Sequence, residues 1–313
     1  MGTYILRAGI RAFFIMLIVM TGVFLILRLG PMEPAEYVLG DYATPDTIAS
    51  FNQAMGLDQP LHEQYFGFVK KVLRGDLGNS FMHKQPVLSL LKDVLPYTLE
   101  LIAAGMIIGL LIGIPPGILA ALKPNSVYDQ TVRFITMLGM SMPSFVIGIF
   151  LLSIFSLQLD WLPAFGAGDE NSFSDRVLRL ILPALSVGIM KLAAVARLTR
   201  ASLLEVLGKD YILTARSKGL KESIVVLKHA LRNSLLPLVT FIGIYINILL
   251  GAAVLIEVIF ARPGVGRLIV EAIKGSDFPV VQTVIMFYAG AVVLVNLSID
   301  VFYSLIDPRI RLK

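Results

Sequence analysis

Side chains that commonly carry catalysis or bind metals are few and scattered in this chain. It contains no cysteine, and its three histidines, His62, His83 and His229, are too widely separated to form a His-x-x-x-His pair. Thiolates and paired imidazoles are the usual ligands of zinc, so we expect no metal site. The Gly-x-Ser-x-Gly pattern of a nucleophilic serine is also absent from the sequence. These residue types therefore do not predict an enzyme.

A nucleotide-binding sequence is missing as well. A phosphate loop needs the pattern Gly-x-x-x-x-Gly-Lys-Ser/Thr, because its backbone amides and lysine surround the phosphates, and no such segment occurs here. The glycine-rich run at residues 263–266 lacks the lysine. We therefore expect no nucleotide cofactor to be bound by this chain.

The composition is that of a membrane protein with several spans. The 313 residues are 56% hydrophobic and 16% charged, and the mean hydropathy is +0.79. Such a chain is too apolar for a soluble domain. The net charge of +5 could indicate nucleic-acid binding, but the basic residues lie in short loops beside apolar runs, where they act as orientation signals. We therefore predict an all-α polytopic membrane protein that binds no nucleic acid.

Six apolar stretches predict six transmembrane helices, because about 20 helical residues cross a bilayer. These stretches are residues 12–27, 96–122, 134–157, 177–198, 238–258 and 280–305. The basic side chains near both ends of the chain place both termini in the cytoplasm by the positive-inside rule; they are Arg7, Arg11, Arg309, Arg311 and Lys313. The predicted location is therefore a membrane, with both termini on its cytoplasmic side.

Polar residues and prolines between the first two spans predict a small extracytoplasmic segment with short helices near residues 47–55 and 61–73. The predicted division is the first transmembrane helix at 1–29, the extracytoplasmic segment at 30–95, and a five-helix core at 96–313 with a cytoplasmic loop at 199–237. Prolines should shape the core helices: Pro96 suits a helix start, residues 115–117 should kink or end the second span, and residues 141–145 should break the third.

Some residues inside the spans have two interpretations. Gly105, Gly109 and Gly113 recur every four residues, which favours close helix packing over a pore lining. Lys191 lies toward the inner end of its span, so we expect its amine to reach the lipid headgroups rather than a substrate. Asp300 could equally cap or pair near the inner end of the last span or serve transport.

One polar stretch, residues 200–237, stands out from the apolar sequence around it. It has three acidic residues, Glu205, Asp210 and Glu222, and seven basic ones: Arg200, Lys209, Arg216, Lys218, Lys221, Lys228 and Arg232. Apolar side chains recur among these charges at roughly helical spacing, and Gly219 interrupts them where a short helix could turn. The charge excess indicates a cytoplasmic loop, and the pattern indicates more than a solvated tether.

The same stretch resembles the coupling signature in the permease subunits of type I ATP-binding-cassette (ABC) importers. The similar residues are 210–220 (DYILTARSKGL) and 228–233 (KHALRN), followed by Pro237. The similarity is to the dipeptide/oligopeptide branch, which includes nickel and glutathione systems, and to its first-permease (B-type) group. Leu213-Thr214 replaces the usual Glu-Ala pair, and the Leu-Pro pair falls later than in the general pattern. Residues 57–61, 64–65, 75–81 and 257–268 also resemble this branch.

The resemblance implies a MetI-like fold and a transport subunit rather than an enzyme. A short helix in the loop would dock on a separate ATPase, and the implied coupling residues are Tyr211, Leu213, Thr214, Ala215, Arg216, Lys218, Gly219 and Leu220. We expect apolar docking by Leu213, Ala215 and Leu220 to dominate over ion pairs of Arg216 and Lys218, because exposed pairs contribute little. The implied partners are two ABC ATPases, a second homologous permease and an extracytoplasmic solute-binding protein.

The implied function is ATP-driven import of peptides or related small solutes. Dipeptides, oligopeptides, glutathione, nickel and metallophores all remain open as solutes. The alternative is an ion-driven secondary transporter or channel, which would need ionisable or broken-helix sites in several spans. The predicted spans offer little for that beyond Lys191 and Asp300.

Overall fold

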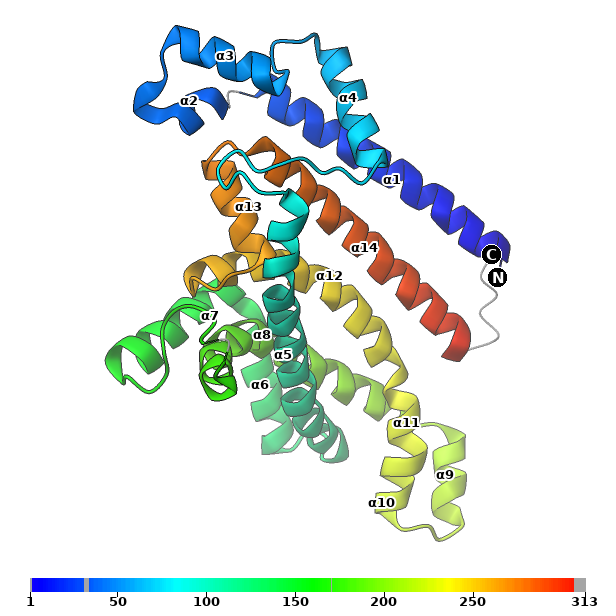
Figure 1. Cartoon of the computed structure of the whole chain (residues 1–313). Coiled ribbons are helices and arrows are strands. Elements are labelled where there is room, and N and C mark those ends of the chain that lie inside the picture. The colour runs from blue at the N-terminus through cyan, green and yellow to red at the C-terminus, as the bar shows by residue number, and fades with distance from the viewer. Residues whose placement is uncertain (1, 31–33, 170, 307–313) are drawn as a thin grey trace. The chain divides into compact units, whose positions relative to one another are not determined.

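The computed structural model describes residues 2–30, 34–169 and 171–306, and these residues are almost entirely helical (Figure 1). Within these ranges no β-strand is formed, and the extended pairing consists of one isolated antiparallel bridge between Asn79 and Pro86. The chain folds as two compact units, Met1–Pro96 with Gly264–Lys313, and Tyr97–Pro263. The predicted all-α class is confirmed.

Among the described residues, five helices are long and apolar enough to cross a membrane: α1 (Gly2–Leu29), α5 (Val87–Leu122), α8 (Phe173–Leu207), α12 (Leu236–Ile259) and α14 (Phe278–Ile306). A bent pair gives a sixth candidate if it is counted as one span. Of the terminal basic residues, Arg309, Arg311 and Lys313 lie outside the described residues, as does the side chain of Asp300.

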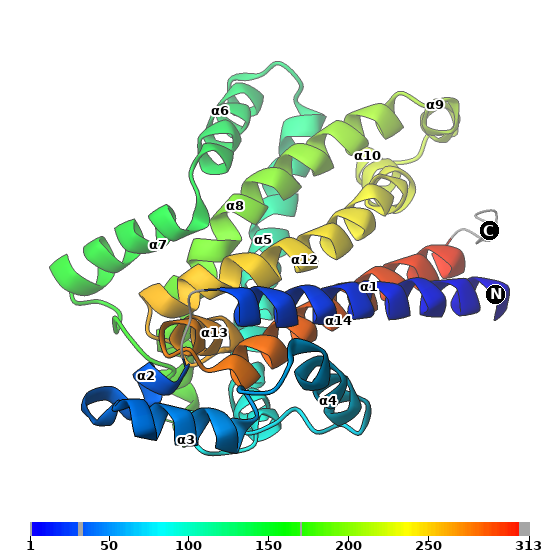
Figure 2. The same ribbon diagram turned by 90° about the horizontal axis from the view of Figure 1, so that it is seen from above.

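The bent pair confirms the predicted break at residues 141–145. Helix α6 (Val127–Ser141) is followed by α7 (Ser144–Leu151) and its continuation η2 (Leu152–Gln158), and the two halves are bent by 98° (Figure 2). Pro143 stands immediately before α7, where its ring stops the preceding helix and its missing amide leaves no unpaired donor. The bend therefore has a local cause in the sequence.

The predicted start of α5 at Pro96 was wrong. The helix begins at Val87 rather than at Pro96, directly after Pro86, whose carbonyl accepts the first bond, from the Ser89 amide (3.0 Å). The helix continues through residues 115–117 and ends at Leu122, the predicted end of the second span. Prolines within a membrane helix are tolerated where a neighbouring helix packs against the same segment, and α8 does so here.

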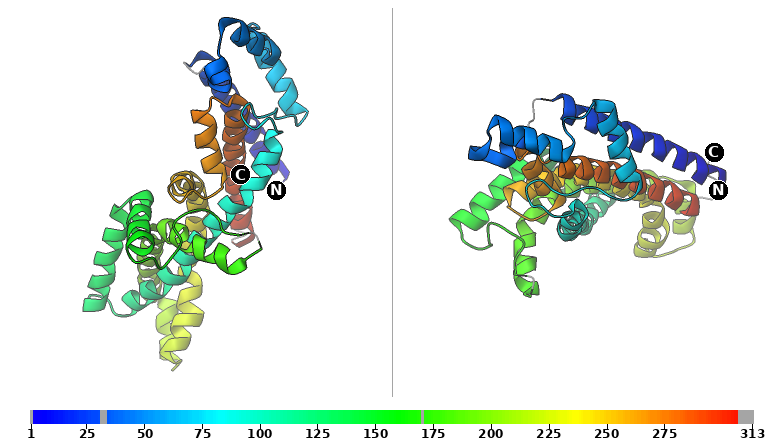
Figure 3. Two further views of the ribbon diagram at one scale, coloured as in Figure 1. Left: turned by 60° about the vertical axis from the view of Figure 1, so that its left-hand side comes forward. Right: turned by 45° about the horizontal axis from the view of Figure 1, so that its top comes forward.

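The first compact unit is built on α1 and α14, which lie side by side (Figure 3). Its shorter elements are α2 (Pro34–Leu39), η1 (Gly40–Tyr42), α3 (Pro45–Met55), α4 (Leu61–Leu73) and α13 (Val265–Lys274). The core joins α1, the start of α5, α13 and α14 through Val23, Leu27, Val87, Leu91, Leu268, Phe278 and Val281, among others.

The two short helices predicted near residues 47–55 and 61–73 are confirmed as α3 and α4, and their extracytoplasmic location stays a prediction. Helix α3 starts with a capping box in which the side chains of Thr44 and Thr47 each accept a bond from the other's backbone amide. It ends at Gly56, whose φ of +67° is the left-handed conformation that glycine adopts without strain. Local residue types thus determine both ends of this helix.

A buried carboxylate fastens the loop before α5 to the start of α14. Asp277 is 1% exposed, and its oxygens accept bonds from the Ser80 hydroxyl (2.5 Å), the Phe81 amide (3.1 Å) and the Met82 amide (3.2 Å). The Ser80 hydroxyl in turn accepts a bond from the His83 amide (2.8 Å). A carboxylate is suited to this position because all three groups around it can donate.

We expect Asp277→Asn to lower the free energy of unfolding by about 1–3 kcal/mol, because the amide turns a donor toward groups that also donate. Thermal unfolding of the purified chain in detergent measures the change. Asp76→Asn is the matched control, since the Asp76 carboxylate is exposed and accepts one local bond, from the Gly78 amide (2.9 Å). Equal stability of the Asp277 variant and the control would contradict the prediction.

The second unit is organised around α8, which contacts α6, α7 and α12. A row of glycines on α5 lies directly against α8. A Cβ atom added at Gly109 would fall 2.8 Å from the Lys191 Cβ, and one at Gly113 would fall 2.8 Å from the Leu192 carbonyl oxygen. Gly117 extends the row, with only 2.6 Å from its added Cβ to the Ala196 oxygen. The glycines therefore serve close packing, as predicted.

The expectation that the Lys191 amine reaches the lipid headgroups was wrong. Lys191 is 2% exposed, and its Nζ lies 4.1 Å from the centre of the Tyr245 ring on α12. A cation above an aromatic face is attracted by the negative face of the ring. The packing of α8 between α5 and α12 directs the amine inward, which position along the span could not indicate.

The stretch at residues 257–268, which resembles the peptide-permease branch, contributes two buried charged residues to the second unit, Glu257 and Arg262. Arg262, which is 1% exposed, donates from Nη2 to Glu100 Oε2 (2.7 Å), and Glu100 also pairs with Arg176 of α8. Glu257 accepts a bond from the Thr98 hydroxyl (2.6 Å). These bonds connect residues 98–100 of α5 to the start of α8 and to the end of α12.

Candidate functional site

The predicted coupling loop folds as a small helical hairpin. After α8 ends at Leu207, α9 (Asp210–Ser217) is followed by α10 (Glu222–Ile224), η3 (Val225–Ala230) and α11 (Leu231–Ser234), which lead into α12. Figure 1 shows α9 beside α10 and α11 at the end of α12. The first residues of the loop predicted at 199–237 thus belong to the continuous helix α8.

The sequence of α9 accounts for its boundaries. Lys209 is extended, with ψ of 147°, and Asp210 then places a negative charge in the first turn, where the helix dipole favours it. Arg216 lies in the last turn, where the dipole favours a cation. Gly219 has φ of +76°, so the predicted turn at this glycine is confirmed.

One face of α9 is buried against the rest of the same unit. Ile212 (0% exposed) and Ala215 (8%) form a core with Ala121 at the end of α5 and Leu203 of α8, and η3 adds Val225. This core attaches α9 to both long helices. It also corrects the expectation for Ala215: its methyl group is used inside the chain and is not presented for docking.

Other apolar side chains of the hairpin are exposed. Five large side chains, each between 38% and 63% exposed, form what we call the apolar face: Tyr211, Leu213, Leu220, Ile224 and Leu227. Thr214 and Lys218 are exposed beside them. The implied coupling residues did not include Ile224 and Leu227, although Leu227 is one of the apolar residues that recur at roughly helical spacing in this stretch.

Two polar pairs hold the hairpin in shape. Arg216 donates from Nη2 to Glu222 Oε1 (2.6 Å) and from Nε to Oε2 (3.1 Å). Asn233 of α11 donates to the Tyr211 hydroxyl (3.0 Å). The first pair lowers the pKa of the Glu222 carboxyl and raises the pKa of the Arg216 guanidinium through their mutual hydrogen bonds. Because the Glu222 pKa is lowered, this pair is intact at neutral pH and is lost only as the pH falls through that value.

For the solute uptake that the resemblance implies, we expect Arg216→Gln to reduce the rate by no more than about fivefold, because exposed ion pairs contribute little. Arg216 already pairs within the loop, so a partner protein would have to compete with Glu222 for it. Uptake by membrane vesicles at pH 7 measures the effect, with Glu222→Gln as the matched variant that removes the same pair. Complete loss of uptake in Arg216→Gln, with normal uptake in Glu222→Gln, would instead show a direct contact to a partner.

Comparison with known proteins identifies the family. Residues 113–312 match the model of the binding-protein-dependent transport system inner membrane component, and residues 1–102 match the model of the N-terminal part of such membrane components. The chain belongs to this family. The permease therefore carries both parts that these models describe, and the resemblance seen in the coupling loop extends over nearly all of its sequence.

Curated relatives support the same assignment. The permease is 40% identical over 312 residues to a probable peptide ABC transporter permease protein of Sinorhizobium fredii, covering 99% of this chain and 100% of the relative. It is 39% identical over 309 residues to a dipeptide transport system permease protein of Alkalihalophilus pseudofirmus, covering 92% and 93%. A glutathione transport system permease protein of Salmonella choleraesuis is 39% identical over 310 residues, covering 99% of each.

Solved structures confirm the expected fold. The permease matches the MetNI methionine ABC transporter in an inward-facing conformation with a TM-score of 0.58 and 21% sequence identity, over 70% of this chain and 97% of the other. The fold is thus that of a MetI-like importer permease. Membership of the family implies ATPase and substrate-binding partners, and it favours a transport subunit over a secondary transporter.

Proposed function

We propose that this permease forms half of a translocation pathway through which an ATP-driven importer moves peptides or peptide-like small solutes across the cytoplasmic membrane. The names of its relatives, which specify peptide, dipeptide and glutathione transport, support the solute class. The observation that carries the proposal is the coupling hairpin, whose buried face is anchored to α5 and α8 while its apolar face is exposed.

In this proposal the hairpin transmits the movement of an ATPase to the spans. Leu213, Leu220 and the other members of the apolar face occupy a groove of the ATPase, because burying apolar surface is the main source of docking energy. Thr214, Lys218 and Gly219 shape and border the contact. When ATP closes the ATPases, α9 moves with them, and the core around Ile212 and Ala215 passes the motion to α5 and α8.

The complete assembly comprises this permease, a second homologous permease, two ABC ATPases and an extracytoplasmic solute-binding protein. Both termini and the coupling hairpin lie in the cytoplasm, which the excess of basic residues in the hairpin supports. ATP and magnesium belong to the ATPase subunits, because this chain has no phosphate-loop sequence.

Purification of the tagged permease in mild detergent tests the proposal. We expect two phosphate-loop ATPases and a homologous permease to co-purify, as identified by mass spectrometry. The ATPase activity of the complex should rise when the solute-binding protein and a dipeptide or glutathione are added together. The solute that raises the activity more identifies the class of transported solute. A permease that purifies alone and moves solute down an ion gradient would contradict the proposal.

A further inference from the structure

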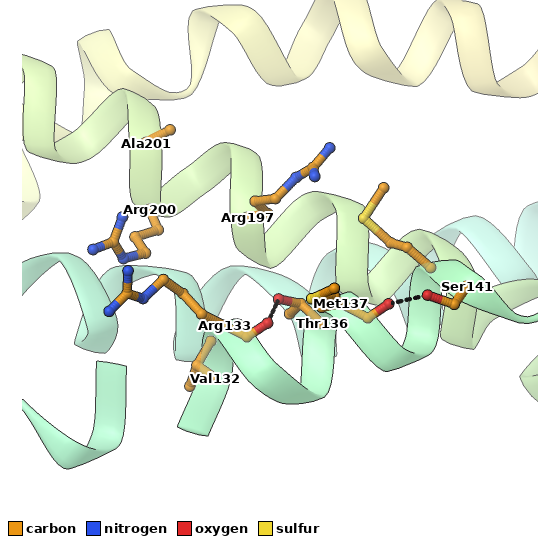
Figure 4. Close-up of a pocket in the computed structure, with 9 residues that line it drawn as sticks. Val132, Arg133, Thr136, Met137, Ser141, Arg197, Arg200 and Ala201 are labelled. Atoms are coloured by element: carbon orange, nitrogen blue, oxygen red, sulfur yellow. Dashed lines mark hydrogen bonds between the residues drawn. The ribbon is translucent and has the colours of Figure 1, made fainter. Parts of the chain in front are cut away.

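A basic pocket lies between α6 and α8, on the side of α8 that faces away from the glycine row of α5. It has a volume of about 540 Å³ and is lined by three arginines, Arg133, Arg197 and Arg200 (Figure 4). The rest of its wall is mainly apolar, with Val132, Met137 and Met140. None of these residues belongs to the coupling hairpin.

The charges in the pocket do not cancel. Asp129 is fully buried next to the pocket and accepts two bonds from Arg200, at 2.5 Å and 2.7 Å, while Arg133 lies 3.7 Å from the same carboxylate. The Asn125 amide also donates to Asp129 (2.9 Å), so this carboxylate is fully used. Arg197 is exposed and forms no ion pair with any residue of the described ranges. Arg133 and Arg200 thus share one carboxylate, and Arg197 pairs with none among the described residues.

The place of this charge excess suggests its ligand. A guanidinium group can bind a phosphate through two parallel hydrogen bonds, which makes arginine well suited to phosphate recognition. Helix α6 also carries exposed apolar side chains at Phe134, Ile135 and Leu138, as expected of a surface in contact with lipid. A ligand with a phosphate next to apolar chains would satisfy both the arginines and the apolar wall.

We propose that this pocket binds a phosphate-bearing anion, in the form of an anionic lipid headgroup of the cytoplasmic leaflet. This assignment rests on the cytoplasmic orientation in the proposed function, which puts Arg133 and Arg197 at the inner membrane boundary. Basic residues beside a span attract anionic lipids because that leaflet carries negative surface charge. A free phosphate compound offers the same chemistry and is the alternative source of the anion.

The test measures lipid binding to the purified complex by native mass spectrometry, without ATP or peptide. Wild type and Arg197→Gln are titrated with phosphatidylglycerol and, separately, with phosphatidylcholine. Lys123→Gln is the matched control, because it removes one exposed basic charge near the start of α6 but outside the pocket. Arg200 is left unchanged because it neutralises the buried Asp129. A second arm replaces the lipid with inorganic phosphate or pyrophosphate.

We expect Arg197→Gln to weaken phosphatidylglycerol binding roughly fivefold, the contribution typical of one basic residue near an anionic membrane surface. Lys123→Gln and the phosphatidylcholine titration should show little change. If inorganic phosphate binds instead and Arg197→Gln weakens it, the site stands and its ligand is soluble.

Equal affinities in Arg197→Gln and Lys123→Gln, or no anion bound in either arm, would overturn the inference. Because the measurement needs neither ATP hydrolysis nor transport, its failure is distinguishable from failure of the proposed function, which co-purification and uptake test separately.

Discussion

Replacing Leu213 by glutamate should stop uptake while leaving the permease folded. Leu213 is 52% exposed on α9 and belongs to the apolar face, so a charge there costs the isolated chain little. In the proposed complex the same side chain is buried against the ATPase. Central interface residues of this kind contribute about 2 kcal/mol or more, which corresponds to docking roughly 30-fold weaker or worse.

The measurement is peptide uptake by proteoliposomes, together with solute-stimulated ATPase activity and the amount of ATPase that co-purifies with the permease. Leu73→Glu is the matched control, because Leu73 ends α4, is 78% exposed and lies in the segment assigned to the opposite side of the membrane. Normal uptake and normal ATPase retention in Leu213→Glu would show that the apolar face is not part of the coupling contact.

The double change Gly113→Ala with Gly117→Ala should sharply reduce the yield of folded permease. Each added methyl group meets a backbone carbonyl oxygen of α8, at 2.8 Å and 2.6 Å, so the two helices must move apart. Overpacking of this kind costs about 1–3 kcal/mol for each site, or about 2–6 kcal/mol together. That is a large fraction of the roughly 5–15 kcal/mol that stabilises a typical protein.

The control for this prediction is Gly251→Ala with Gly290→Ala. These glycines lie within α12 and α14, and an added Cβ at either one meets nothing within 4 Å. Thermal unfolding and monodispersity of the separately purified chain in detergent report the difference between the two double variants. Similar unfolding temperatures for both would mean that the α5–α8 contact has room for the added methyl groups.

Local signals in the sequence predicted the elements that they control directly. The helices α3 and α4, the break at Pro143 and the turn at Gly219 each depend on a few neighbouring residues, so they could be identified without knowledge of the tertiary structure. The start of α5 could not, because Pro96 and Pro86 both suit a helix start. Only the packing of Val87 and Leu91 in the core of the first unit distinguishes them.

Contacts between distant residues account for what was missed at the coupling hairpin. The helical period of α9 indicates two faces, but it does not say which one packs inside the chain. The partners that bury Ala215, namely Ala121 and Leu203, come from two other helices. For the same reason, no spacing rule could pair Asp129 with Arg200, on which the basic pocket depends. The coupling role of the hairpin residues remains a prediction.

The length of α8 has a mechanical consequence. It contains 35 residues, which at about 1.5 Å per residue makes a rod roughly 50 Å long. A rotation of about 5° around its middle would displace its two ends in opposite directions by about 2 Å. The hairpin holds one end through Leu203, and Glu100 holds the other through Arg176.

A displacement of that size exceeds the tolerance of a hydrogen bond, which weakens beyond about 3.2 Å between donor and acceptor. A force applied at the hairpin would therefore strain the ion pairs of Glu100 with Arg176 and Arg262 at the far end of α8. Pro183 lies between the two ends and leaves one backbone hydrogen bond of α8 unmade, so bending would concentrate there. Helix α8 can thus act as a lever between the hairpin and Glu100, and it bends most easily at Pro183.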